Sequence, residues 1–199
     1  MTIRAAPALA ELLNPAAEAW ADVDGESVRL TPIALDAQPT DYVRVSWADR
    51  PYGNVEEVRV AAARDGDDVL VRLEWADSDV PNTEFQDAAA VFFPSGGDAP
   101  VATIGSQERP VDLWFWQANL PAPRWVAATG PGAFAPDSSG RLEAAAMIDD
   151  GRWAVVLRGS ASVLAPSGKL GVVVWDGSND ERAGIGAVTP EWITVELAG

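Results

Sequence analysis

Short runs of β-forming residues, each bounded by turn residues, limit the fold of this 199-residue chain most strongly. From residue 42 onward we expect nine strands, at 42–47, 57–61, 68–75, 88–93, 111–117, 142–148, 153–158, 170–175 and 192–197. The pairs Asp65-Gly66 and Asp150-Gly151 are typical of tight hairpin turns. No long helix is indicated. The pattern therefore predicts an all-β fold, an antiparallel β-sandwich of about nine strands with long loops and little helix.

The length suits one domain, which we expect to span residues 1–199 with an irregular N-terminal segment at 1–40. Pro15 interrupts the one stretch there that could form helical turns. Long loops are expected at 94–110 and 176–190. Because binding residues of β-sandwiches usually lie on such loops, these two are the first places to look for function.

Composition excludes several classes of function. The net charge of -16 disfavours nucleic acid and anionic membranes as partners and is compatible with a basic partner protein or with solubility alone. Cysteine and histidine are absent, which excludes disulfides, cysteine- or histidine-bound metals, thiolate nucleophiles and histidine bases. No apolar run of about 18 residues is present, so we expect no membrane span. We predict no catalytic residue and no metal site.

Two kinds of residue nevertheless suggest binding. Trp114 and Trp116 lie two apart on the strand expected at 111–117, so both face one side of its sheet. That face could stack on a sugar or a flat macrocycle, or pack in a core or interface.

Acidic residues form a second group of candidates. After the strand at 68–75 come four carboxylates without the spacing of a calcium loop, which we interpret as solvated charges: Asp77, Asp79, Glu84 and Asp87. The stretch DGSNDER at 176–182 predicts a turn whose side chains cap its own backbone.

Five segments carry a family resemblance: VLVRLEWAD at 69–77, FQDAAAVFFP at 85–94, RPVDLWFWQA at 109–118, GRWAVVLR at 151–158, and VWDG at 174–177 followed by Glu181-Arg182 and Trp192. In this order they resemble the haem-b-binding γ subunit of the ethylbenzene dehydrogenase and dimethylsulfide dehydrogenase group, over about residues 20–197. These are periplasmic molybdenum enzymes of the dimethyl sulfoxide reductase superfamily. The resemblance implies a β-sandwich that binds one haem b and receives electrons from a molybdopterin subunit through an iron–sulfur subunit.

The resemblance also implies two axial ligands for the haem iron. A methionine stands directly before the glycine that precedes the Pro-Val-x-Leu-Trp strand, and a lysine follows the Asp-Gly loop. Here the methionine position falls at Ile104, before Gly105, and the lysine position at Gly186, with Ile185 as the neighbouring possibility. None of these side chains can ligate iron.

The predicted haem-pocket positions are therefore Ile104, Gly105, Trp114, Trp116 and Gly186, with both axial ligands replaced. Met147 and Lys169 lie outside the ligand loops of the family. We interpret Met147 as core filler and Lys169, the only lysine, as a solvated charge.

These observations predict a non-catalytic, gamma-like accessory subunit of a molybdenum oxidoreductase complex, without the family's haem ligation. It would dock on the iron–sulfur or molybdopterin subunit through loops 94–110 and 176–190, with Ile104 and Ile185 filling the haem pocket. One alternative is a haem b electron-transfer subunit with altered coordination. Another is a carbohydrate-binding sandwich that uses Trp114 and Trp116. The family implies the periplasm, but the start of the sequence lacks a basic, apolar leader, which favours the cytoplasm over export together with a partner that carries a leader.

Overall fold

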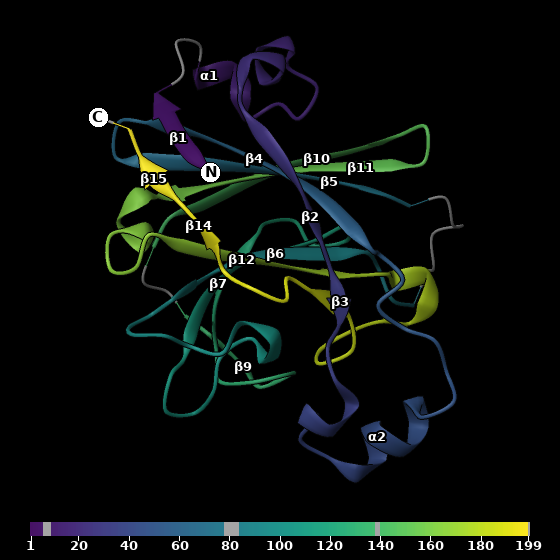
Figure 1. The fold of residues 1–199 in the computed structure, drawn as a ribbon. Coiled ribbons are helices and arrows are strands. Elements are labelled where there is room, and N and C mark those ends of the chain that lie inside the picture. The colour runs from purple at the N-terminus through teal and green to yellow at the C-terminus, as the bar shows by residue number, and fades with distance from the viewer. Residues whose placement is uncertain (6–8, 78–83, 138–139, 199) are drawn as a thin grey trace.

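The computed structural model describes residues 1–5, 9–77, 84–137 and 140–198. Two β-sheets lie face to face and form a sandwich, which Figure 1 shows nearly edge-on. No helix in the described ranges is long and apolar enough to cross a membrane. The predicted all-β sandwich is confirmed.

The first sheet has the strand order β10 (Leu142–Asp149), β11 (Arg152–Ser160), β5 (Asp68–Ala76), β4 (Glu57–Asp65), β1 (Thr2–Ala5) and β15 (Glu196–Leu197), with β2 (Gly25–Arg29) also paired to β4. The strand β1 runs parallel to β4 and β15, while the other pairs in this sheet are antiparallel. Strands from the two ends of the chain thus lie side by side in one sheet.

The second sheet has the order β3 (Thr31–Pro32), β13 (Ala187–Val188), β12 (Lys169–Trp175), β6 (Ala88–Pro94), β7 (Val111–Gln117), β8 (Arg124–Ala128) and β9 (Phe134–Pro136), with β14 (Ile193–Thr194) paired to β12. Its strand pairs are antiparallel. The strand β6 is central and is buried along its whole length. A strand buried throughout needs a covering layer on both faces of its sheet.

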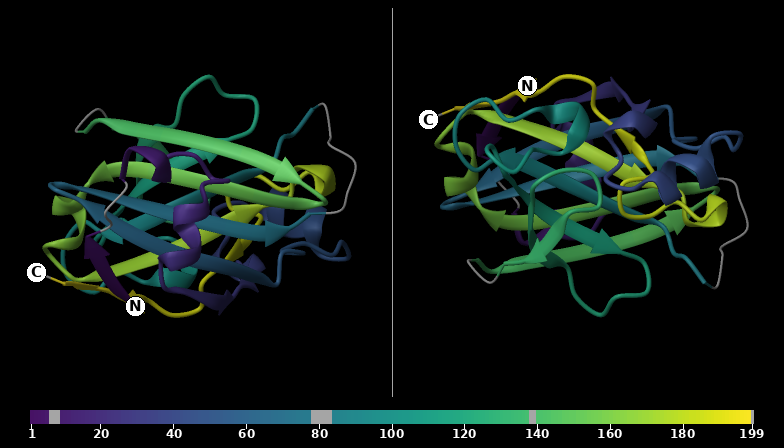
Figure 2. Two further views of the ribbon diagram at one scale, coloured as in Figure 1. Left: turned by 90° about the horizontal axis from the view of Figure 1, so that it is seen from above. Right: turned by 90° about the horizontal axis from the view of Figure 1, so that it is seen from below.

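Two apolar layers provide this cover, and a third lies on the first sheet. The inner layer lies between the sheets and includes Val71, Trp75, Val91, Trp114 and Val172. An outer layer covers the far face of the second sheet, and a smaller one lies where α1 (Leu9–Leu12) and the 3-10 helix η1 (Glu18–Asp22) cross the first sheet. The left panel of Figure 2 shows the N-terminal turns lying across the first sheet.

Both predicted hairpins are confirmed. Asp65 pairs with Asp68 and Asp149 pairs with Arg152, so each connection has two residues. Asp150 and Gly151 both have positive φ, at 44° and 67°, as a primed turn requires.

The predicted strand at 42–47 is wrong, because α2 (Asp41–Trp47) forms there instead. Thr40 begins the helix, and its hydroxyl accepts a hydrogen bond from the Val43 amide at 3.4 Å. Val43 and Trp47 lie four apart and face the body, which is a helical spacing.

The remaining eight predicted strands correspond to observed ones, with 192–197 divided between β14 and β15. The segment 1–40 is more regular than expected, since it contributes β1, β2 and β3 together with the 3-10 helix η2 (Leu35–Ala37). Three further 3-10 helices lie in connections: η3 (Val101–Thr103), η4 (Ala161–Leu164) and η5 (Gly177–Asn179).

Candidate functional site

Ile104 is buried in the outer layer of the second sheet. It ends η3 in a left-handed conformation, with φ 53° and ψ 54°. Its amide donates to the Val101 carbonyl at 3.0 Å, and the Gly105 amide donates to the Pro100 carbonyl at 2.9 Å. The Ile104 side chain is 0% exposed and belongs to a cluster with Val126, Trp175 and neighbouring apolar residues. The loop therefore holds an apolar side chain inward at this position.

Gly186 lies against the tryptophan that ends β12. A Cβ atom at Gly186 would lie 2.7 Å from Trp175 Cδ1 and 2.8 Å from the Val174 carbonyl oxygen. The Trp175 indole is fixed by a 3.0 Å hydrogen bond from its Nε1 to the Ala183 carbonyl. Ile185, the neighbouring possibility, is buried at 4% exposure. The backbone leaves no room for a longer side chain at Gly186 without a shift of this indole.

Trp114 and Trp116 share one face of their sheet, as predicted, and that face is the inner core. They are 0% and 8% exposed. Trp116 packs on Trp153 with ring centroids 5.0 Å apart, and Trp114 packs on Phe93 at 4.8 Å.

The structure therefore brings Ile104, Gly105 and Gly186 to the outer side of the second sheet and places the two tryptophans on its opposite face. Because their rings are buried, they form no exposed platform for a sugar.

The two remaining candidate ligands lie elsewhere. Met147 is half-buried on β10, at the edge of the first sheet. Lys169 starts β12, and its Nζ bonds Asp98 Oδ1 at 2.6 Å. This ion pair joins the loop 94–110 to β12 at the surface, where the Lys169 side chain is 32% exposed. The pairing holds the pKa of the Asp98 carboxyl below its usual value.

The predicted turn at 176–182 is confirmed, and buried carboxylates organise it. Asp176 Oδ1 accepts from the Ser178 hydroxyl at 2.6 Å and from the Asn179 amide at 3.2 Å. Glu181, 1% exposed, accepts from the amides of Gly53 at 2.6 Å and Asp176 at 3.1 Å. Burial raises the pKa of Glu181, with nearby Asp176 acting in the same direction and the hydrogen bonds opposing it.

Of the acids after β5, Glu84 is exposed as expected, while Asp77 and Asp87 hold neighbouring groups in place. Trp153 Nε1 lies 3.2 Å from Asp77 Oδ2 and 3.2 Å from Asp87 Oδ2, and the other oxygen of Asp87 accepts from the Gly177 amide at 2.9 Å. Asp87 is 7% exposed, so the expectation of a solvated charge is wrong there. Asp79 lies outside the described residues. Nothing in the sequence signalled that Asp87 would anchor the loop 176–182.

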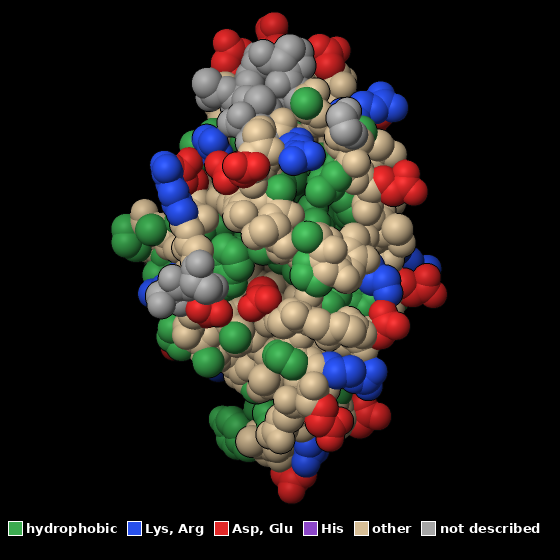
Figure 3. Space-filling view, turned by 90° about the vertical axis from the view of Figure 1, so that its left-hand side faces the viewer, with side chains coloured by type: hydrophobic (Ala, Val, Ile, Leu, Met, Phe, Trp, Pro, Cys, Tyr) green, Lys and Arg blue, Asp and Glu red, His purple; other side chains and the backbone are tan. Residues whose placement is uncertain are grey.

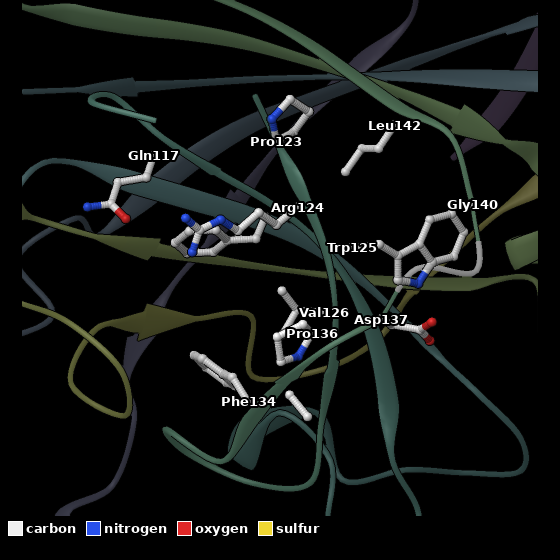
Figure 4. Close-up of a pocket in the computed structure, with 12 residues that line it drawn as sticks. Gln117, Pro123, Arg124, Trp125, Val126, Phe134, Pro136, Asp137, Gly140 and Leu142 are labelled. Carbon is white, nitrogen blue, oxygen red and sulfur yellow. The ribbon is translucent and has the colours of Figure 1, made fainter. Parts of the chain in front are cut away.

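A cavity of about 570 Å³ opens beside β7, β8 and β9 (Figure 4). Its walls are mainly aromatic and aliphatic, with Gln117, Arg124 and Asp137 as its polar groups. A smaller cavity of about 210 Å³ shares the Phe115, Gln117 and Phe134 side chains with it and reaches Trp175 and Glu181. The outer side of the second sheet is thus hollowed next to the position of Gly186.

Comparisons with known proteins agree on one family. The family described as "Ethylbenzene dehydrogenase" matches residues 17–140. The chain belongs to the ethylbenzene dehydrogenase family.

Its relatives include named subunits of oxidoreductases. The chain is 30% identical over 194 residues to the ORF7 product of Haloferax mediterranei, named for a respiratory nitrate reductase heme subunit, covering 90% of this chain and 66% of that protein. It is 32% identical over 153 residues to the chlorate reductase subunit gamma of Ideonella dechloratans, covering 69% and 63%. It is 26% identical over 164 residues to the dimethylsulfide dehydrogenase subunit gamma of Rhodovulum sulfidophilum, covering 71% and 61%. The chain spans slightly less than two thirds of the length of these relatives.

In this member of the ethylbenzene dehydrogenase family, the residues do not fit a haem held by methionine and lysine at the predicted positions. Ile104 has no ligating atom and its side chain packs among apolar groups, while Gly186 has no side chain and little room for one. Among the described residues, no group of three or more acidic, histidine or cysteine side chains could hold a metal ion.

Proposed function

We propose that this chain is a non-catalytic, gamma-like accessory subunit of a molybdenum oxidoreductase complex, without the haem ligation of its family. It packs on the iron–sulfur or molybdopterin subunit through loops 94–110 and 176–190. Membership of the ethylbenzene dehydrogenase family supports this role, as do the relatives named as gamma subunits of chlorate reductase and dimethylsulfide dehydrogenase.

Two observations support this role over electron transfer through haem. The side chain at Ile104 is fully buried in an apolar cluster, and Trp175 lies where a side chain at position 186 would begin. A position that lost its ligand is expected to be filled by apolar side chains, because buried voids are costly. Ile104 and Trp175 fill these two positions, while the cavity beside β7, β8 and β9 stays open.

Purification from the native host tests the role. A tagged form of the full chain is isolated under mild conditions, its partners are identified by mass spectrometry, and molybdenum and iron are measured in the complex. We expect a molybdopterin subunit and an iron–sulfur subunit in fixed ratio with the tagged chain. A chain that elutes without either of them contradicts the proposal.

A haem b electron-transfer subunit with altered coordination is the second candidate, and the relative named for a heme subunit favours it. Absorbance spectra of the reduced protein decide between the two, after reconstitution with excess haem and removal of the unbound fraction. Absence of a Soret and α band supports the haem-free subunit. Soret and α bands that correspond to one haem per chain support electron transfer and overturn the haem-free role.

A further inference from the structure

The helix α2 carries the two most exposed large hydrophobic side chains in the described part of the chain. Tyr42 is 81% exposed and Val45 is 76% exposed. They lie three residues apart, so they share one face of the helix, which we call the α2 ridge. The opposite face points to the body through Val43 and Trp47, and Trp47 is 8% exposed. Figure 1 shows α2 standing away from both sheets at one end of the molecule.

The ridge is held in place by contacts to the loop 176–190. The Arg50 guanidinium lies 4.2 Å from the Trp47 ring centroid and donates to Asp180 Oδ2 at 2.8 Å and to the Asn179 carbonyl at 2.6 Å. Before the helix, buried Gln38 donates from its Nε2 to the Gly184 carbonyl at 2.6 Å. An apolar face fixed before binding loses little conformational entropy when a partner covers it.

A groove lies beside the ridge. It has a volume of about 480 Å³ and runs between α2 and two loops of the body, with Tyr42, Phe85, Pro131, Arg182 and Ile185 among its lining residues. A projecting tyrosine next to a groove matches the centre of protein interfaces, where tyrosine is enriched and partners interdigitate.

Charge around the ridge identifies the kind of partner. Arg44 is bonded to Asp41 and Arg50 to Asp180, while Arg182 lies over the Phe85 ring at 3.9 Å and donates to the Asp180 carbonyl. Asp36 and Asp49 are exposed and form no ion pair within the described residues. The chain as a whole carries a net charge of -16. At the α2 end of the molecule in Figure 3, hydrophobic side chains lie at the surface beside charged ones. The matching surface is therefore apolar at its centre and basic at its rim.

We propose that the α2 ridge, which adjoins the loop 176–190, extends the docking surface of this subunit and enters an apolar, basic-rimmed pocket on the iron–sulfur or molybdopterin subunit. This inference rests on the proposed function and names the contact within it. A second copy of the chain fits less well, because a two-fold interface would bring the same uncompensated aspartates together.

Affinity measurements on the native complex test the ridge. The double variant Tyr42→Ala, Val45→Ala keeps α2, since alanine is the best helix former, and circular dichroism and melting confirm the fold. The matched control is the double variant Ile148→Ala, Leu197→Ala. It removes two exposed apolar side chains, 46% and 37% exposed, from β10 and β15 of the first sheet. We expect the ridge variant to bind the purified partner subunit about 30-fold or more weakly and the control to bind like wild type.

A charge variant tests the basic rim. We expect Asp36→Asn with Asp49→Asn to slow association and to weaken its dependence on ionic strength, while the dissociation rate stays unchanged. An association rate and salt dependence equal to those of wild type contradict the basic rim.

The outcomes separate this inference from the function it rests on. If purification of the wild-type chain recovers no iron–sulfur or molybdopterin subunit, both the proposed function and the docking surface are contradicted. If wild type and the ridge variant bind that subunit equally, the docking surface is wrong and the proposed function stands. If sedimentation shows a wild-type dimer that the ridge variant abolishes, the ridge pairs two copies of the chain and the inference is overturned.

Discussion

Ile104 combines a buried β-branched side chain with a left-handed backbone. Its φ of 53° is a conformation that β-branched residues seldom adopt and that costs about 1–3 kcal/mol. The surrounding packing must outweigh this strain. The family resemblance implied a methionine at this position, but it did not indicate where the isoleucine side chain goes, because its burial depends on β8 and β12, which are distant in the chain.

We expect Ile104→Ala to lower the free energy of unfolding by about 2–4 kcal/mol, because it leaves a cavity in a packed layer. Urea unfolding measures this. Ile148→Ala, at a position 46% exposed, serves as the control and should change stability by less than about 0.5 kcal/mol. Equal effects of the two substitutions would show that the outer layer is not packed around Ile104.

Glu181 should make stability depend on pH in an unusual direction. Burial raises its folded pKa above the ordinary value of 4.5, so the folded state binds the proton more tightly than the unfolded state. The stability that this provides is fully present below pH 4.5 and is lost as the pH rises through the folded pKa.

We expect Glu181→Gln to remove this loss. As the pH rises from 4.5, the free energy of unfolding of the variant should therefore increase relative to that of wild type. Urea titrations at several pH values measure the difference. The matched control is Glu191→Gln at an exposed position, where the difference should stay flat. A flat difference for Glu181→Gln would rule out a raised pKa.

At the scale of elements, strands with strong alternation were predictable and those defined by their partners were not. The hairpins β4–β5 and β10–β11 were indicated by their Asp-Gly pairs, although the first turn is Gly66-Asp67, one residue later than predicted. The strands β3 and β13 have two residues each and exist because each lies beside another strand. At 42–47 the alternating pattern also fits a helix. The segment forms a helix because Thr40 caps its start and no strand lies beside it to pair with.

The loop after β12 depends on one glycine. A Cβ at Gly177 would lie 2.4 Å from the Gln86 carbonyl carbon and 2.6 Å from the Asp87 amide nitrogen. These are backbone atoms and cannot rotate away, so we expect Gly177→Ala to destabilise the protein by about 1–3 kcal/mol. Gly96→Ala is the matched control, because nothing lies within 4 Å of the added atom. Thermal melting compares the two, and equal melting temperatures would contradict this packing.

For the whole molecule, composition and pattern predicted two packed sheets but not which faces would be covered. The continuous apolar run in β6 is compatible with a sheet buried on both faces, yet only the fold shows that the loop 94–110 supplies part of the outer cover through Val101 and Ile104. The same limit applies to the candidate site. Ile104 and Gly186 could be singled out from the family resemblance, whereas the exposure of Tyr42 and Val45 depends on α2, which the sequence pattern disguised.

The net charge of -16 should oppose folding at low salt, because like charges repel more strongly in the compact state. Screening shortens the reach of this repulsion from about 30 Å at 0.01 M salt to about 8 Å at 0.15 M. The attractive pairs that salt also weakens, such as Arg4 with Asp24, are mostly exposed and contribute little. We therefore expect the melting temperature at pH 8 to rise by about 2–4 °C between these salt concentrations, as a gain of about 1 kcal/mol would give.

Near the pI of about 4.2 the repulsion vanishes, and the same addition of salt should leave the melting temperature unchanged or lower it. A melting temperature at pH 8 that is insensitive to salt would contradict the expected rise and would mean that the acidic groups are spaced or paired well enough to relieve their repulsion.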